Sequence, residues 1–159
     1  MAKRYILTTE KDLNALREVS KPVTVFDEKL WQLLDDMADT MRAANGLGLA
    51  APQVGVLKRA FIVSSVDEKH IYEFINPVIK SQSGSHVSSE GCLSIPKISG
   101  YVARPKKVIV EAQNRFGEWF EFRSTELLIC AAISHEHDHL EGILYSDKII
   151  EGYKPKKAK

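Results

Sequence analysis

Apolar residues recur at helical spacing in an early segment of the chain. A stripe that repeats every three or four residues comprises Leu30, Leu33, Leu34, Met37 and Met41. Asp27 precedes this stripe as a candidate N-cap, and Asn45-Gly46 follows it as a stop signal. We therefore predict an amphipathic helix over residues 27–44.

The middle of the chain contains short runs rich in β-branched and aromatic residues. Residues 60–64 and 71–75 are separated by a polar turn, which predicts a β-hairpin. Residues 107–112 and 118–122 flank a turn, 114–117, that ends in glycine, and this pattern predicts a second hairpin. Short connections of this kind join antiparallel strands, so we expect mostly antiparallel sheet.

A second helix is predicted to begin at Ser124 or Thr125 and to continue through Leu140, with Gly142 as its C-terminal cap. Strands grouped in the middle and helices on both sides predict the α+β class, with mostly antiparallel sheets packed around a C-terminal helix. Neither a repeat nor a linker is visible, so residues 1–159 are expected to form a single catalytic domain.

Composition narrows the classes of function. The chain has 159 residues, of which 44% are hydrophobic and 27% charged, as in an ordinary globular protein. A formal net charge of +1 does not favour a general binder of nucleic acids or anionic membranes.

The N-terminus lacks an apolar signal region, and no apolar run approaches roughly 18 residues, so we expect a cytoplasmic protein. Cys92 and Cys130 should then remain reduced.

The end of the chain is rich in lysine. Residues 154–159 read Lys-Pro-Lys-Lys-Ala-Lys, and the tail from about residue 152 is expected to be a solvated, frayed terminus. Contact with the ribosome is a second interpretation of the same charges.

The strongest chemical pattern is His-Glu-x-x-His, formed by His135, Glu136 and His139. On a helix, residues four apart lie on the same face, so both imidazoles can bind one metal ion while Glu136 reaches a water molecule. A pair of buried core histidines is the structural alternative. Because the flanking sequence is apolar, however, two buried imidazoles beside a glutamate would need a compensating partner, and a cation would serve. We therefore predict metal-assisted hydrolysis.

A catalytic site of this kind needs a third protein ligand. The longer motif with a third histidine six residues later is excluded, because that position is Tyr145. Glu151 is the only carboxylate far enough downstream to be a ligand, and we expect it to lie in a loose tail. Cys92 is the best upstream candidate, since Gly and Pro around it indicate irregular backbone. Cys130 should point about 140° away from the motif face. His137 should also point away from the metal.

Three segments together resemble the peptide deformylase family. Gly-Leu-Gly-Leu-Ala-Ala-Pro-Gln-Val-Gly at 46–55 matches the first motif of that family, Glu-Gly-Cys-Leu-Ser at 90–94 the second, and His-Glu-His-Asp-His at 135–139 the third. Two departures are mild: Ser134 stands where many members have Gln, and Pro52 occupies a variable position. The resemblance implies a hydrolase that removes the N-formyl group from the initiator methionine of nascent polypeptides and releases formate.

The resemblance also implies a metal and its ligands. Cys92, His135 and His139 would hold one divalent ion, with a further position left for water. The residue types alone favour zinc, whereas the family implies Fe(II), with Ni(II) or Co(II) as working substitutes. Glu136 would act as the general base and then as the acid.

Other roles are implied by the matching motif positions. The side-chain amide of Gln53 and the backbone N–H of Leu93 would stabilise the oxyanion. Substrate contacts are expected from Leu47, Gly48, Glu90, Arg104, Leu128 and Ala131. For Arg104, a surface salt bridge is an equally good interpretation.

Two other functions fit the motif taken alone. A metallopeptidase that cleaves ordinary peptide bonds would also carry His-Glu-x-x-His. A domain with a purely structural metal would keep the same ligands without needing Glu136. The expected partners are N-formylmethionyl nascent peptides, with no membrane and no sequence-specific nucleic acid.

Overall fold

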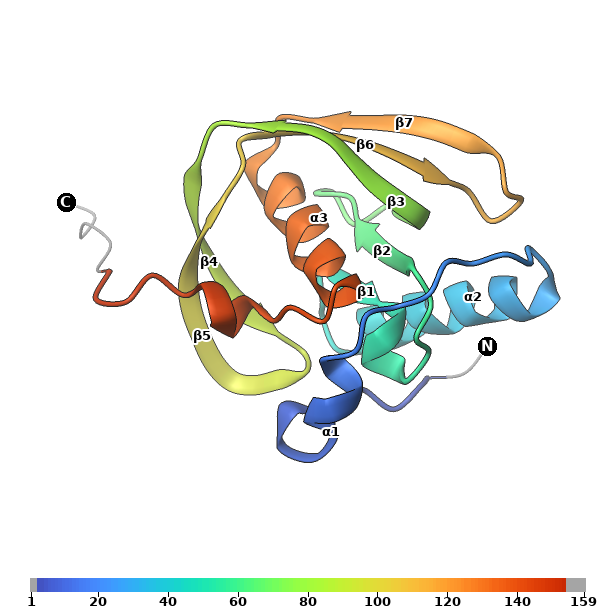
Figure 1. The fold of residues 1–159 in the computed structure, drawn as a ribbon, viewed down its shortest axis with the longest axis horizontal. Coiled ribbons are helices and arrows are strands. Elements are labelled where there is room, and N and C mark those ends of the chain that lie inside the picture. Colours follow the sequence, from blue (N-terminus) through green and yellow to red (C-terminus); the bar gives the residue numbers. More distant parts are fainter. Residues whose placement is uncertain (1–2, 154–159) are drawn as a thin grey trace.

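The computed structural model describes residues 3–153. Along the chain these form α1 (Thr9–Leu16), α2 (Glu28–Ala43), β1 (Gly48–Ala50), the 3-10 helix η1 (Ala51–Val54), β2 (Ala60–Ser64), β3 (Ile71–Ser83), β4 (His86–Cys92), β5 (Ile95–Arg104), β6 (Lys107–Gln113), β7 (Trp119–Ser124), α3 (Leu127–Leu140) and the 3-10 helix η2 (Tyr145–Lys148). Helix α3 lies in the centre, with strands on several sides (Figure 1). The predicted α+β class is confirmed.

The larger sheet has five strands in the order β1-β2-β3-β6-β7, and every neighbouring pair is antiparallel. Both predicted hairpins are confirmed, since β2 pairs with β3 and β6 pairs with β7. Strand β3 extends to Ser83, well beyond the expected end at residue 75. Irregular pairing between Ile75 and Val78 accommodates Pro77, which sequence patterns interpret as the end of a strand.

The smaller sheet consists of β4 and β5 alone, and the hydrophobic pattern does not predict it. Strand β4 reads His-Val-Ser-Ser-Glu-Gly-Cys, which lacks the apolar alternation of a half-buried strand. Seven residue pairs join β4 to β5, from His86 opposite Arg104 to Cys92 opposite Ile95. This pairing stabilises the strand, although its composition does not favour one. This hairpin places Cys92 at the end of β4.

The first long helix is confirmed, and the second begins later than expected. The carboxylate of Asp27 accepts a hydrogen bond of 3.2 Å from the backbone N–H of Leu30 at the start of α2. Ser124 pairs with Val108 in the sheet, so it cannot open α3, and Glu126 occupies the N-cap position instead. None of the helices within residues 3–153 is long and apolar enough to cross a membrane.

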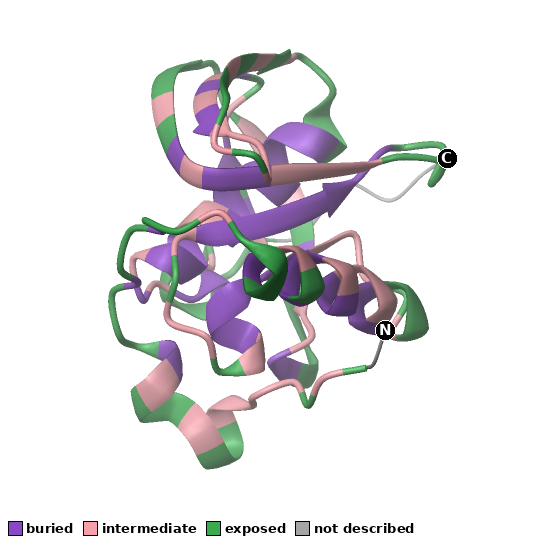
Figure 2. Ribbon diagram, turned by 90° about the vertical axis from the view of Figure 1, so that its right-hand side faces the viewer, coloured by how far each residue is buried: buried purple, intermediate pink, exposed green. Residues whose placement is uncertain are grey.

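Helix α3 is buried along most of its length, and the centre of the molecule in Figure 2 is correspondingly buried. Its apolar side chains Ile129 and Ile133 belong to the same core cluster as Phe61 of β2 and Phe74 of β3. The polar residues in the second half of α3, apart from the half-buried His137, are buried as well and so lie inside the protein. Buried polar groups need partners, and these partners define the site.

Candidate active site

Three side chains from two elements meet beside the central helix. Cys92 comes from the end of β4, and His135 and His139 come from successive turns of α3. One ligand atom from each residue lies within 4.8 Å of the other two, and the Cys92 Sγ lies 3.4 Å from the His139 Nε2. The three residues that the sequence analysis grouped together, although they are distant in the chain, thus lie close together in the fold.

The spacing fits a divalent cation. Tetrahedral coordination with a metal–sulfur bond of about 2.3 Å and a metal–nitrogen bond of about 2.0 Å separates sulfur from nitrogen by about 3.5 Å. The observed 3.4 Å agrees with that separation. Cys130 does not belong to the cluster: it is buried, and its thiol donates to the carbonyls of Lys106 and Ser124. Burial raises the pKa of this thiol.

The charges around the histidines also fit a cation. Burial alone would lower the pKa of His135, but its hydrogen bond with Cys92, the charge of Glu136 and its hydrogen bond with Glu90 raise the pKa to about 10. Burial and the nearby positive charge of His135 lower the pKa of His139 to about 3. The carboxylates of Glu90 and Glu136 therefore favour one positive charge beside His135, and a divalent ion bound by neutral imidazoles would supply it.

A buried ion network supports His135 from behind. The His135 Nδ1 lies 2.9 Å from the Glu90 Oε1, which leaves the Nε2 for a metal. Arg104 donates to both carboxylate oxygens of Glu90 at 2.7 Å, and to Asp138 at 2.9 Å. Burial would raise the pKa of Glu90, but the hydrogen bonds from Arg104 and His135 lower it to about 2.

The network corrects the sequence-based interpretation of Arg104. This residue is only 3% exposed and does not line the active-site cavity, so both the substrate contact and the surface salt bridge are wrong. Glu90 lines the cavity, but its carboxylate already holds Arg104 and His135. The role of Asp138 was not anticipated, because Arg104 and Asp138 lie 34 positions apart in the sequence.

Glu136 lines the same cavity as Cys92 and His135, and one of its carboxylate oxygens has no partner in the described part of the chain. The residue is 5% exposed, and its buried Oε1 has no hydrogen-bond partner among the described residues. Burial raises its pKa to about 7. Gly48 of β1 leaves space for this side chain, because a Cβ added there would lie 2.7 Å from the Glu136 Oε2. The absence of a side chain at position 48 thus leaves room for the carboxylate in its observed position.

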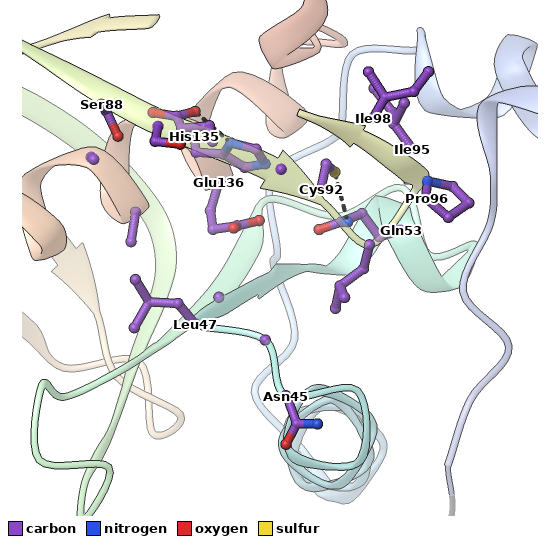
Figure 3. Close-up of a pocket in the computed structure, with 18 of the residues that line it drawn as sticks. Asn45, Leu47, Gln53, Ser88, Cys92, Ile95, Pro96, Ile98, His135 and Glu136 are labelled. Atoms are coloured by element: carbon purple, nitrogen blue, oxygen red, sulfur yellow. Dashed lines mark hydrogen bonds and ion pairs between the residues drawn. The ribbon is translucent and has the colours of Figure 1, made fainter. Parts of the chain in front are cut away.

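The amide of Gln53 is oriented by hydrogen bonds on both sides. Its oxygen accepts from the backbone N–H of Ala50 at 2.9 Å, so its nitrogen faces the site. That nitrogen donates to the Ser94 hydroxyl at 3.1 Å and lies 3.6 Å from the Cys92 Sγ, the contact drawn in Figure 3. Leu93 occupies the turn between β4 and β5 next to the same cysteine.

A cavity of about 430 Å³ opens onto this centre, within the usual size range of small-ligand sites. The predicted contacts Leu47, Gly48, Leu128 and Ala131 all line it, as Figure 3 shows for Leu47. The far side is formed by residues 95–98, which the sequence did not single out. Their proximity to Cys92 in the sequence is the signal that could have identified them as cavity residues.

Comparisons with known proteins agree with this geometry. The family model described as polypeptide deformylase matches residues 3–154. Peptide deformylase from Caldicellulosiruptor bescii is 54% identical over 150 residues, covering 94% of this chain and 87% of that relative. Peptide deformylase 1 from Bacillus subtilis is 43% identical, covering 96% of this chain and 94% of that relative.

Solved structures show the same similarity in three dimensions. A peptide deformylase from Legionella pneumophila superposes with a TM-score of 0.87 at 42% identity, covering 94% of this chain and 87% of that one. The peptide deformylase from Thermotoga maritima gives 0.86 at 36% identity, covering 93% and 98%. The chain belongs to the polypeptide deformylase family, and it is an enzyme that removes the N-formyl group from the initiator methionine of nascent polypeptides.

Proposed function

We propose that deformylation by this chain uses Cys92, His135 and His139 as metal ligands and Glu136 as the proton carrier. The observation that carries the proposal is an unpartnered Glu136 oxygen in the lining of the cavity that Cys92 and His135 also line, next to three clustered ligand atoms. A structural metal site would not need a buried carboxylate with a free oxygen in that position. The arrangement therefore favours hydrolysis.

When bound, a divalent ion would acidify water and polarise the formyl carbonyl. By family resemblance the ion is Fe(II), with Ni(II), Co(II) or Zn(II) as substitutes that the Cys and His ligands also accept. Anaerobic purification followed by metal analysis identifies the ion. Iron close to one equivalent per chain supports this choice, whereas zinc alone in an equally active sample contradicts it.

Glu136 moves the proton in this scheme. Its pKa of about 7 allows it to accept a proton from water at neutral pH and then to donate that proton to the leaving amine. Its burial keeps the proton away from bulk solvent between the two transfers. The amine of methionine leaves, and formate is the other product.

The oxyanion formed on attack needs hydrogen-bond donors that are already oriented. The amide nitrogen of Gln53 meets this requirement, because its oxygen is fixed by Ala50 and its nitrogen faces Cys92. The backbone N–H of Leu93, in the adjacent turn, is the second proposed donor. Leu47, Leu128 and Ala131 would contact the methionine side chain from the apolar part of the cavity.

One relative's structure supports a peptide ligand. A peptide deformylase from Acinetobacter baumannii, 32% identical with a TM-score of 0.85, is described as bound to Met-Ala-Ser. We infer that the corresponding formylated tripeptide is a suitable substrate here. Nascent chains arise at ribosomes, so we also infer a cytoplasmic enzyme. The lysines proposed to contact the ribosome, residues 154–159, lie outside the described residues.

Formate release from formyl-Met-Ala-Ser tests the proposed function, with acetyl-Met-Ala-Ser as the matched control. We expect formate from the first peptide and no cleavage of the second. Equal cleavage of internal bonds in longer unformylated peptides would identify a metallopeptidase instead.

The ligand assignment has its own test in the two cysteines. Cys92→Ser should lose most of its metal and activity, because the hydroxyl is a far weaker ligand for this class of ion. Cys130→Ser should keep both, since its thiol contacts only backbone carbonyls. The reverse pattern would show that Cys130 is the ligand.

A further inference from the structure

We propose that Tyr145 is a positioning residue with two separable parts: its ring orients the His135 imidazole, and its hydroxyl holds the Ile98 carbonyl at the wall of the substrate cavity. This inference rests on the proposed role of His135 as a metal ligand. The sequence placed Tyr145 where a longer zinc motif would require a third histidine. The structure shows this residue supporting a ligand rather than replacing one.

The ring contact lies on the face of His135. The two ring centroids are 5.8 Å apart, the planes are inclined by 22°, and Tyr145 is only 2% exposed. His135 is held in two further directions, by Glu90 at its Nδ1 and by the ring of His139 at 5.2 Å. Because Glu90 holds one nitrogen and the His139 ring packs at an angle to the imidazole, the stacked tyrosine ring restricts the remaining rotation of the imidazole about its side-chain bonds.

The hydroxyl contact lies on the substrate side. The Tyr145 hydroxyl donates a hydrogen bond of 3.0 Å to the backbone carbonyl of Ile98. Ile98 lines the cavity, and Figure 3 shows it on the same side as Ile95 and Pro96. Its neighbour Lys97 has a φ of 67°, a left-handed conformation that a residue with a side chain adopts rarely. A strained wall of this kind needs support from surrounding structure.

Tyr145 is itself firmly held. It begins η2, which lies against β5 in Figure 1, and it belongs to a core cluster with Leu16, Ile95 and Val102. Cys92 packs against the same cluster. The tyrosine therefore forms a rigid support behind two of the three proposed ligands and beneath the cavity wall.

The ring is tested by the rate at which the metal leaves. Co(II)-loaded protein is mixed with an excess of a colorimetric chelator, and release is followed in the wild type, Tyr145→Phe and Tyr145→Leu. Loss of a group that orients a metal-bound histidine typically costs 10- to 100-fold in metal affinity, so we expect Tyr145→Leu to release the ion at least ~10-fold faster. Tyr145→Phe keeps the ring and should remain within about 2-fold of the wild type.

Leu34→Ala is the control for general loss of stability. Leu34 is fully buried in the cluster around α2, away from the metal ligands, and its truncation should destabilise the fold by about 2–5 kcal/mol. If Leu34→Ala releases Co(II) as quickly as Tyr145→Leu, the effect of the ring is merely structural and the proposal is wrong. If the wild type binds no Co(II), both the proposal and the ligand assignment fail.

The hydroxyl is tested by steady-state kinetics with formyl-Met-Ala-Ser. A net hydrogen bond of about 0.5–1.5 kcal/mol corresponds to roughly a 2- to 10-fold effect, which we expect as a higher KM in Tyr145→Phe with kcat within about 2-fold. An unchanged KM would refute the role of the hydroxyl. A fall in kcat without a change in KM would also refute it, because the contact is with the cavity wall and not with the reacting atoms.

Discussion

Replacing Gly48 with alanine tests how the Glu136 carboxylate is positioned. An alanine Cβ at this position would lie 2.7 Å from the Oε2, 2.9 Å from the Cγ and 3.1 Å from the Cδ of Glu136. Carbon atoms attract best at about 3.5–4.0 Å, so these contacts are repulsive. The backbone of β1 is held by pairing with β2, and the side chain of Glu136 must therefore move.

This movement should reduce activity much more than it reduces the stability of the fold. Glu136 lines the cavity, so its whole side chain can rotate into that space. Alanine also restricts the unfolded chain by about 0.4–1 kcal/mol relative to glycine. We therefore expect the free energy of unfolding to change by less than about 1 kcal/mol. A displacement of about 1 Å in a catalytic group can cost about 100-fold in rate. We expect kcat/KM to fall about 100-fold with metal content unchanged.

A double-mutant cycle with Glu136→Ala shows whether the effect passes through this carboxylate. Formate release and urea unfolding are measured for both single variants and for the double variant. Alanine at position 48 should reduce activity strongly in the wild-type background and hardly at all when Glu136 is absent. An equal reduction in both backgrounds, or unchanged activity in Gly48→Ala, would refute the proposed positioning.

Two further predictions concern ion pairs. Arg104→Met removes the buried cation that Glu90 and Asp138 share, and leaves them with His135 and Lys148 as their other partners. The variant should cost about 3–5 kcal/mol and lower Tm on the order of 10 °C, measured by calorimetry; an unchanged Tm contradicts this. Hydrogen bonding to Arg17 lowers the pKa of Asp147, so this pair stabilises the fold while Asp147 is charged. In urea unfolding, Arg17→Ala should therefore reduce the free energy of unfolding near pH 7, and this reduction should shrink as the pH falls below about 4. A reduction that grows at low pH contradicts the prediction.

Much of the fold was predictable because its hydrophobic pattern is local. The stripe of α2 and the two hairpins of the larger sheet follow from residues close in sequence. The β4–β5 hairpin was not predictable in this way, because β4 is a polar strand. Its conformation depends on pairing with β5 and on the contacts that its side chains make in the site. The later start of α3 has a similar cause, since Ser124 is a good helix cap but is already engaged in the sheet.

The candidate site also has a part that local sequence patterns predict and a part that they do not. Helical spacing brings His135 and His139 together, and irregular backbone marks Cys92. Strand alternation places Glu90 and Cys92 on one face of β4, which was a usable signal for a shared role. Glu90 and Arg104 lie in adjacent strands, but Arg104 pairs with His86 and Glu90 pairs with Gly100. Their contact is made by the long arginine side chain and could not be inferred from spacing.

In the proposed mechanism, Glu136 carries the proton at a centre held by Cys92, His135 and His139. Its most direct test is formate release from formyl-Met-Ala-Ser by the wild type and Glu136→Gln at matched metal content. We expect the same metal occupancy and an activity at least ~100-fold lower in the variant. Comparable formate release by the two proteins would contradict it.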